Sequence, residues 1–169
     1  MERMWSPWRS QYMDSFKESK QSDKSFIQEA IESDNDRENL VVYKFDKTIV
    51  MLNKYPYNNG HILILPKREV NDILLLDDDE YLEINKVIKV CIKAVLNVYN
   101  PHGYNLGVNS GTAAGAGVPS HLHYHIVPRW NGDSNFMPVI ADIKVVSESL
   151  YDSREKLNNE IQKILSKND

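Results

Sequence analysis

Residues 121–127 have the sequence His-Leu-His-Tyr-His-Ile-Val. Successive side chains of a β-strand point to opposite faces. A strand here would place its three histidines on one face and Leu122, Tyr124 and Ile126 on the other. These are three of the five histidines in the protein. Their alternation predicts a functional face rather than an ordinary polar strand surface.

Two kinds of chemistry use such a row of imidazoles. Two imidazoles separated by one residue can chelate a metal ion. Alternatively, the central histidine attacks as a nucleophile and its neighbours orient it, because an imidazole with a pKa near about 6.5 is partly neutral at cellular pH. Residues 109–117, Asn-Ser-Gly-Thr-Ala-Ala-Gly-Ala-Gly, precede the strand. Small residues let backbone N–H groups approach an anion, so the loop favours phosphate chemistry over metal binding.

The surrounding pattern predicts an α+β fold with a mostly antiparallel five-stranded sheet, one long helix packed on it and a C-terminal helix. The helical spacing of apolar residues predicts the long helix from the acidic start at 77–80 to Val98. Ser153 is expected to cap the C-terminal helix, and a short amphipathic helix is expected after Asp23. Strands are expected at 40–45 and 48–52, which form a hairpin through Asp46-Lys47, and at 61–65, 104–108 and 121–127.

Composition excludes several classes of protein. The chain has 169 residues, 20 Lys+Arg and 24 Asp+Glu, so its net charge of −4 argues against nonspecific nucleic-acid binding. No run approaches 18 apolar residues, which argues against a membrane span. Cys91 is the only cysteine, so no disulfide framework is possible. We therefore expect a cytoplasmic protein without nucleic-acid or membrane partners.

The stretch at 121–127 resembles the histidine triad (HIT) superfamily, whose hallmark is His-φ-His-φ-His-φ-φ with φ apolar. Residues 53–61, Asn-Lys-Tyr-Pro-Tyr-Asn-Asn-Gly-His, resemble a second block of the same family. The resemblance spans about residues 40–135. Residues 5–9, Trp-Ser-Pro-Trp-Arg, and 128–136, which include Pro-Arg-Trp, resemble the diadenosine tetraphosphate phosphorylase-like branch.

This resemblance implies a division of the chain and an assembly. Residues 1–39 would be a partly ordered N-terminal extension, residues 40–138 the catalytic HIT domain, and residues 139–169 a C-terminal segment with a helix. The protein would be a homodimer in which the sheets of two subunits join.

The resemblance also assigns the catalytic roles. His123 would attack the α-phosphorus of a nucleotide and form a nucleotidyl-histidine. The carbonyl of His121 would accept a hydrogen bond from the other ring nitrogen of His123, which fixes its tautomer. His125 would donate to a phosphate oxygen, and His61 would support the triad from the neighbouring strand.

Substrate contacts are implied at six further positions. Asn53 would bind ribose hydroxyls, although an Asn at a strand end also commonly closes a local turn. Met51 shares a face with Asn53 and would help to form the purine wall. The remaining contacts would be Asn109 to phosphate or ribose, the N–H groups of Gly117 and Val118 to phosphates, and Trp130 to substrate.

The chain departs from the family pattern in two places. Relatives often carry Ser, Thr or Gln three or four residues before the first histidine, where this chain has Val118 and Gly117. Assistance to the leaving group would then come from backbone amides, from Ser110 or Thr112, or from protons on the substrate. Some relatives hold zinc with an N-terminal Cys-x-x-Cys, whereas residues 25–28 contain no cysteine. We therefore expect no structural zinc and no required cofactor, with at most a divalent ion on the substrate phosphates.

The expected activity is cleavage of the α-phosphate linkage of a dinucleoside polyphosphate, such as diadenosine tetraphosphate, with inorganic phosphate or water as acceptor. Three alternatives remain at this point. They are a HIT-type nucleoside phosphoramidate or nucleotide hydrolase, a metal-dependent hydrolase using the three-histidine strand, and a non-catalytic nucleotide-binding module.

Overall fold

The structure is a computed structural model that describes residues 26–133 and 147–167. Five strands form one antiparallel sheet, which confirms the predicted fold class. Across the sheet the order is β1-β2-β3-β5-β4. The strands are β1 (Val41–Lys44), β2 (Thr48–Leu52), β3 (Ile62–Pro66), β4 (Gly103–Val108) and β5 (Tyr124–Arg129).

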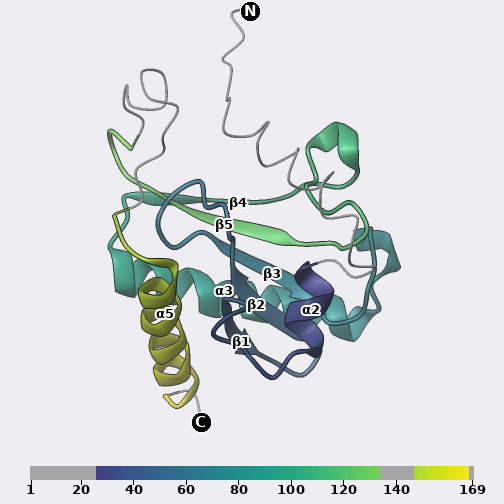
Figure 1. The fold of residues 1–169 in the computed structure, drawn as a ribbon, viewed down its shortest axis with the longest axis horizontal. Coiled ribbons are helices and arrows are strands. Elements are labelled where there is room, and N and C mark those ends of the chain that lie inside the picture. Colours follow the sequence, from purple (N-terminus) through teal and green to yellow (C-terminus); the bar gives the residue numbers. More distant parts are fainter. Residues whose placement is uncertain (1–25, 134–146, 168–169) are drawn as a thin grey trace, which may run out of the picture.

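Helices cover both faces of the sheet. Figure 1 shows α3 behind the sheet, α2 in front of it and α5 beside β1. Within the described ranges, no helix is both long and apolar enough to span a membrane. The α-helices are α2 (Phe26–Glu32), α3 (Asp78–Tyr99) and α5 (Leu150–Leu165), and the 3₁₀ turns are η1 (Ile73–Leu75) and η2 (Thr112–Ala114).

The two faces of the sheet carry separate apolar clusters. On the side of α3 and α5, strand residues such as Ile64 and Ile126 pack against Ile84 of α3 and Leu157 of α5. On the opposite side, α2 covers a smaller cluster over β1, β2 and β3. That cluster contains Ile27, Ala30, Val41, Ile49, Met51, Leu63, Leu65 and Val118. Because this cluster extends over β1, β2 and β3, the part of the same face over β5 is left to the histidines.

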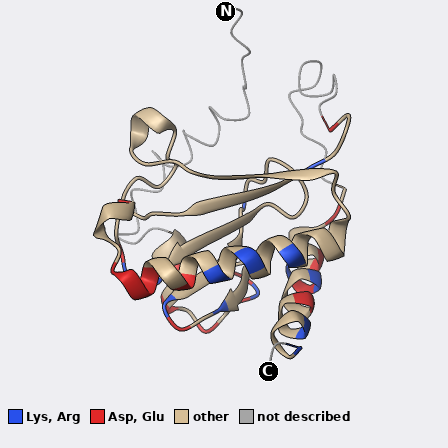
Figure 2. Ribbon diagram, turned by 180° about the vertical axis from the view of Figure 1, so that it is seen from behind, with Lys and Arg blue, Asp and Glu red and all other residues tan. Residues whose placement is uncertain are grey.

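Local signals set the ends of α3 as predicted. The Asp77 side chain accepts from the Glu80 N–H at 2.7 Å, and the Glu80 side chain accepts from the Asp77 N–H at 3.0 Å, which is a capping box. Asn100 ends the helix in the left-handed conformation. Figure 2 shows the acidic start of α3 followed by lysines on its exposed side.

The C-terminal helix begins earlier than predicted. Ser149 caps α5 by accepting from the Asp152 N–H at 3.1 Å, whereas Ser153 lies inside the helix and is buried. The α5 helix also covers the outer edge of β1. Arg154 donates to the Val41 carbonyl at 2.7 Å, and Asn158 donates to the Val42 carbonyl at 2.5 Å. This edge of the sheet is therefore occupied.

The strand predicted at 121–127 is displaced, because β5 begins only at Tyr124 and continues to Arg129. Before Tyr124 the backbone bonds to loops instead of strands, since the Leu122 N–H donates to the Val70 carbonyl at 2.6 Å. Pro128, the first residue after the predicted strand, lies within β5. Beyond Ile126, β5 pairs with β4 alone, so a residue without an N–H is tolerated there.

Several predictions fall outside the described residues. Trp5, Trp8 and the segment 135–136, which carried part of the branch resemblance, are among them. The domain boundaries predicted at residues 39 and 138 stay predictions. What is described of the predicted extension includes α2, and what is described of the C-terminal segment includes α5.

Candidate active site

Four histidines gather on the α2 side of the sheet. His125 pairs with Leu63 of β3 and with Gly107 of β4, and directly paired residues of antiparallel strands point to the same face. We call this side the histidine face. The ring of His125 lies 5.0 Å from that of His123 and 5.2 Å from that of His61, measured between centroids. The alternation predicted from the sequence therefore holds, although the first two triad histidines precede the regular strand.

His123 is held by a backbone carbonyl. Its Nδ1 lies 2.7 Å from the carbonyl oxygen of His121, so Nδ1 carries a proton and donates it. The neutral ring then has its lone pair on Nε2. Burial lowers the pKa of His123 and outweighs the opposing effect of the bond to His121. The side chain is 5% exposed, so a neutral and nucleophilic Nε2 is favoured at neutral pH.

His121 contributes its carbonyl, while its own ring is anchored in the interior. The ring Nε2 donates to the carbonyl of Pro66 at the end of β3, with a separation of 2.8 Å. Burial is the main cause that lowers the pKa of His121, and the nearby His123 lowers it further. A neutral His121 therefore ties the start of β5 to β3.

The other two histidines are connected to each other. The Tyr57 N–H donates to Nδ1 of His61 at 3.1 Å, so that nitrogen carries no proton. A neutral His61 consequently holds its proton on Nε2, which lies 2.9 Å from Nδ1 of His125. His125 accepts there and must carry its own proton on Nε2. A single amide of the 53–60 loop thus determines the tautomers of two rings in sequence.

Two further contacts hold His61 in this arrangement. The Tyr57 ring stacks on the His61 ring with centroids 5.1 Å apart and planes 17° from parallel. The Asn53 side-chain amide lies 3.4 Å from His61 Nδ1, as a second donor to that nitrogen. The position of Tyr57 was not predicted, because its main contribution comes from a backbone N–H that every residue except proline possesses.

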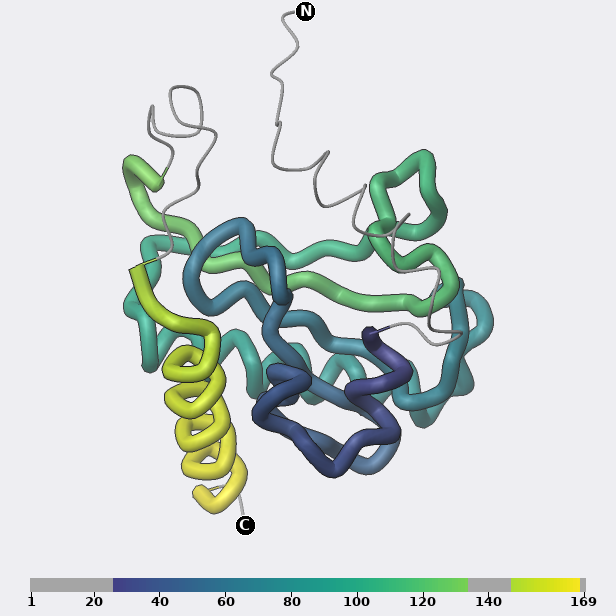
Figure 3. Tube along the Cα trace, in the orientation of Figure 1, coloured from purple at the N-terminus to yellow at the C-terminus, as the bar shows by residue number. Residues whose placement is uncertain are grey.

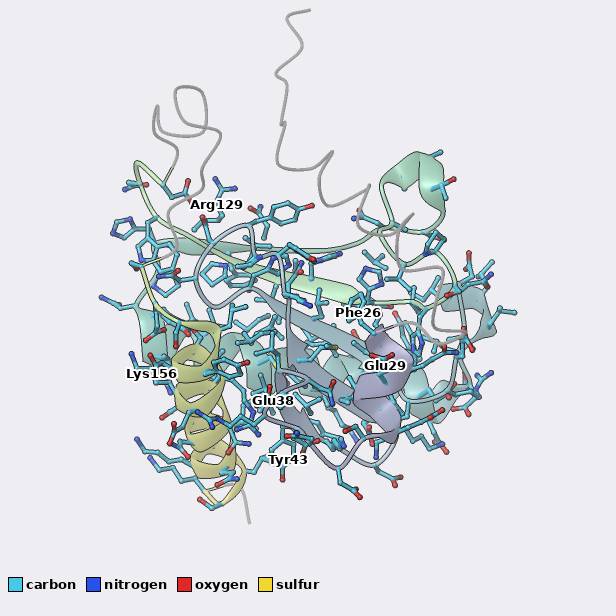
Figure 4. All side chains as sticks on the ribbon, viewed as in Figure 1. Phe26, Glu29, Glu38, Tyr43, Arg129 and Lys156 are labelled. Carbon is cyan, nitrogen blue, oxygen red and sulfur yellow. The ribbon has the colours of Figure 1, made fainter. Side chains whose placement is uncertain are left out.

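Asp133 fixes the 53–60 loop to the end of β5. Its side chain, 11% exposed, accepts from Asn58 at 2.8 Å and from Arg129 at 2.6 and 2.9 Å. The Asn58 amide also donates to the Pro128 carbonyl at 2.9 Å. The bond from Arg129 is the main cause that lowers the pKa of Asp133 far below its ordinary value. Arg129 lies near the top of the view in Figure 4, away from α2 with its labelled residues Phe26 and Glu29.

Gly60, the residue before His61, packs against the end of α3. Its φ of +71° is in the left-handed region, and a Cβ there would lie 2.4 Å from Cε2 of Tyr99. Only glycine fits both conditions without displacement. The Tyr99 hydroxyl donates to Glu148 at 3.3 Å, and burial together with Glu148 raises the pKa of Tyr99 to about 12. Tyr99 at the end of α3 thereby contacts the loop that precedes His61.

Comparison with known proteins agrees with this geometry. Residues 35–132 match the HIT domain family. AP-4-A phosphorylase of Mycobacterium tuberculosis is 38% identical over 164 residues, which cover 95% of this chain and 84% of that protein.

This chain belongs to the HIT family.

Two further relatives of this HIT protein were found. The asymmetrical bis(5′-nucleosyl)-tetraphosphatase of Schizosaccharomyces pombe is 29% identical over 93 residues, which cover 55% of this chain and 50% of that protein. Among solved structures, a hypothetical histidine triad nucleotide-binding protein from Sulfolobus tokodaii superposes with a TM-score of 0.66 at 28% identity. It covers 83% of this chain and 93% of that chain.

Two predicted substrate contacts of the HIT protein have other partners in the fold. Met51 is 2% exposed and lies on the histidine face in the cluster that α2 covers, and its contact with a purine stays a prediction. Asn53 closes a local turn by accepting from the Tyr55 N–H at 2.9 Å, while its amide contacts His61. The alternative considered for Asn53 from sequence is thus present, and a contact with ribose stays a prediction.

The loop expected to hold phosphate lies at one end of the sheet. Figure 3 shows residues 109–120 and the segment 67–76 at the same end of the molecule. Ser110 donates to Asp72 at 3.1 Å, which joins the two segments. Among residues 26–133 and 147–167, the N–H groups of Gly117 and Val118 have no hydrogen-bond acceptor. Asn109 follows β4 directly and is half-buried.

Trp130 follows β5 and is half-buried, with its backbone N–H directed to Asp133 at 3.3 Å. Its predicted contact with substrate stays a prediction. Over the described part of the HIT protein, no three His, Cys, Asp or Glu side chains are arranged to hold a metal ion. The four histidines are instead connected by hydrogen bonds to carbonyls, to one amide and to each other.

Proposed function

We propose that this HIT-family enzyme cleaves a dinucleoside polyphosphate such as diadenosine tetraphosphate at an α-phosphate, through a nucleotidyl group bound to Nε2 of His123. One observation carries the proposal. The Nδ1 proton of the buried His123 ring is donated to the carbonyl of His121, so the lone pair belongs to Nε2. The AP-4-A phosphorylase of M. tuberculosis, at 38% identity, supports this substrate class.

In the first step, His123 Nε2 forms a bond to the α-phosphorus as the bond from phosphorus to the bridging oxygen breaks. For diadenosine tetraphosphate, the products are enzyme-bound AMP and free ATP. The attacking ring gains positive charge and keeps its Nδ1 proton. The hydrogen bond to the His121 carbonyl therefore strengthens, because a charged donor binds an acceptor more tightly than a neutral one.

His125 would stabilise the charge that develops on the phosphate. The chain of donors from the Tyr57 N–H through His61 leaves a proton on His125 Nε2. A proton there donates to a phosphate oxygen without a change of tautomer during the reaction. The amides of Gly117 and Val118, which have no acceptor in the described part of the chain, are suited to hold the neighbouring phosphates. Ser110 is less suited to protonate the leaving group, since its hydroxyl already donates to Asp72.

In the second step, an acceptor attacks the bound nucleotidyl group and releases His123. We propose inorganic phosphate as acceptor, which would give ADP, whereas water would give AMP. The reaction run with and without phosphate separates the two. If the protein forms AMP at an unchanged rate without phosphate, the proposal that it acts as a phosphorylase is wrong.

Mass spectrometry of protein quenched during turnover tests the core of the proposal. We expect a mass increase of one adenylyl group in wild type and none in His123→Ala. His102→Ala is the matched control, because His102 is an exposed histidine in the turn before β4. If wild type turns the substrate over without any adduct, the covalent step is wrong.

The metal-dependent alternative has its own test. The proposed scheme uses no resident cofactor, and a divalent ion would enter with the substrate phosphates. Adduct formation should therefore persist after the protein is dialysed against EDTA. Loss of the adduct on chelation, with recovery on added zinc, would favour the metal-dependent hydrolase.

We also propose a cytoplasmic homodimer joined at β4. The edge at β1 is covered by Arg154 and Asn158 of α5. The edge strand β4 carries Tyr104, Leu106 and Val108, which are 43%, 47% and 37% exposed. Exposed apolar residues on an unpaired edge favour pairing with another strand. Light scattering should give twice the monomer mass, and Leu106→Asp should reduce it to that of the monomer.

A further inference from the structure

Gly107 occupies the position beside His125 on the histidine face. The two residues are directly paired between β4 and β5. Any side chain at Gly107 would therefore project from the same side of the sheet as the His125 ring. Because glycine has none, bare backbone adjoins a ring that contacts both His61 and His123.

The fold itself does not require glycine at this position. Gly107 is not among the glycines with positive φ, and a Cβ placed there would meet no heavy atom of residues 26–133 and 147–167 within 4 Å. This differs from Gly60, where the backbone conformation and the Tyr99 ring both exclude a side chain. Glycine inside a strand weakens it, and it often marks close approach by a ligand. The absence of a side chain at Gly107 therefore leaves space for a ligand that approaches the histidine face.

The residues two positions away on each side complete a polar strip on β4. Asn105 shares the face of Gly107 by the alternation of the strand, and Asn109 directly follows the end of β4. The Asn105 side-chain oxygen accepts from Arg129 at 2.9 Å, and Arg129 is itself held by Asp133. The orientation of the Asn105 amide is thus fixed, and its NH₂ group is not used in that bond. The strip therefore has the side-chain amides of two asparagines at its ends and no side chain at Gly107 between them.

The arrangement of the sheet leaves β4 as a direction in which a long substrate can extend. Over β1, β2 and β3 the histidine face is covered by α2 and its apolar cluster. In the described part of the chain, β4 is the outermost strand on the other side, and residues 104–108 are exposed. The part of a substrate beyond the scissile bond therefore has room across β4, next to His125.

We propose that Gly107 is a specificity-determining residue that admits the leaving group of a dinucleoside polyphosphate across β4. This inference rests on the proposed function and names the position that accommodates substrate length. A side chain at Gly107 would obstruct the phosphates and nucleoside beyond the scissile bond. It would not obstruct the nucleoside and α-phosphate that stay on the enzyme.

Gly107→Val tests the proposal, with Gly103→Val as the matched control. Gly103 lies on the same strand and face, also has no heavy atom within 4 Å of a built Cβ, and pairs with Arg129, four residues from His125. We expect Gly107→Val to lower kcat/KM for diadenosine tetraphosphate by about tenfold or more. Its Kd for AMP, which has no leaving group, should change by less than about twofold. Gly103→Val should change neither quantity.

Several outcomes would overturn the inference. They are unchanged kcat/KM in Gly107→Val, equal losses in kcat/KM and AMP binding, or the same loss in Gly103→Val. A changed oligomeric mass of Gly107→Val would also overturn it, since the space would then belong to a second copy. If Gly107→Val does not fold, Gly107→Ala is measured in the same way with the same criteria. Failure of wild type to cleave the substrate or bind AMP would instead contradict the proposed function.

Discussion

The two pairs of histidines at the site are fixed by different kinds of partner. His121 and His123 donate to backbone carbonyls, at Pro66 and His121 respectively. His61 and His125 depend on each other and on the Tyr57 N–H of an irregular loop. The first pair is positioned by the ends of β3 and β5, whereas the second also requires the loop contacts of Asn58, Gly60 and Asp133. The difference implies that nucleophile and phosphate donor can be disturbed separately.

The largest effect is expected at the first pair. His123→Ala removes the proposed nucleophile and should lower kcat by at least about 10⁴-fold. The melting temperature should change little in comparison, because the ring adjoins the site and does not belong to either apolar cluster. Steady-state kinetics and calorimetry check both quantities, with His102→Ala as control. A loss of less than tenfold would show that another group attacks phosphorus.

A smaller effect is expected at the second pair. His61→Ala removes the donor to His125 Nδ1 and leaves the His125 tautomer unfixed, so kcat should fall by about 10²-fold. His61→Gln should recover about tenfold of that loss, because its side-chain amide can donate toward His125. Adduct formation in single-turnover experiments is the measurement. Equal losses in both variants would mean that the ring serves packing alone.

The loop that seats the second pair can be disturbed without touching either pair. Gly60→Ala places a methyl group 2.4 Å from the Tyr99 ring at a φ of +71°. We expect destabilisation of about 2–4 kcal/mol and a kcat loss within about tenfold. Gly132→Ala is the control, since it has a φ of +79° and no heavy atom within 4 Å. It should lose only about 1 kcal/mol in thermal unfolding. Equal losses of stability in Gly60→Ala and Gly132→Ala would show that the contact with Tyr99 is not the cause.

The smallest effect is expected in the pH dependence of the first step. Burial lowers the pKa of His123, and the neutral ring is the nucleophile. The rate of adduct formation should therefore stay constant as pH falls to about 6.5 and decrease only below it, as the folded ring takes up a proton. The unfolded ring binds its proton at higher pH, so stability should also decrease below about 6.5. An acid limb centred above 6.5 would contradict this assignment.

The sequence alone predicts the features of this fold that depend on neighbouring residues or on a regular period. The acidic residues 77–80 predict the start of α3, because a capping box is completed within four residues. The alternation at 121–127 predicts that three histidines share a face, since this depends only on a period of two. The extent of the strand was not predictable in the same way, because β5 is defined by its partners β3 and β4.

Contacts between distant segments could not be predicted from residue types. The Pro66 carbonyl and the Tyr57 N–H are backbone groups that any sequence supplies, so nothing at these positions indicates a role. Strand periodicity gave the face of Met51 but not what covers that face, and α2 turned out to bury it. Asp133 lies in the segment 128–136 that resembles the phosphorylase-like branch, but its bonds to Asn58 and Arg129 depend on the adjacency of the 53–60 loop and β5.

The cover that α5 provides at β1 has a consequence for growth of the sheet. Arg154 and Asn158 saturate the carbonyls that an incoming strand would need at that edge. The described chain can thus be extended in one direction only, and a second molecule docking symmetrically at β4 would use up the available edge. In such a dimer both outer strands would be occupied, so the C-terminal helix would help to prevent further strands from adding to the sheet.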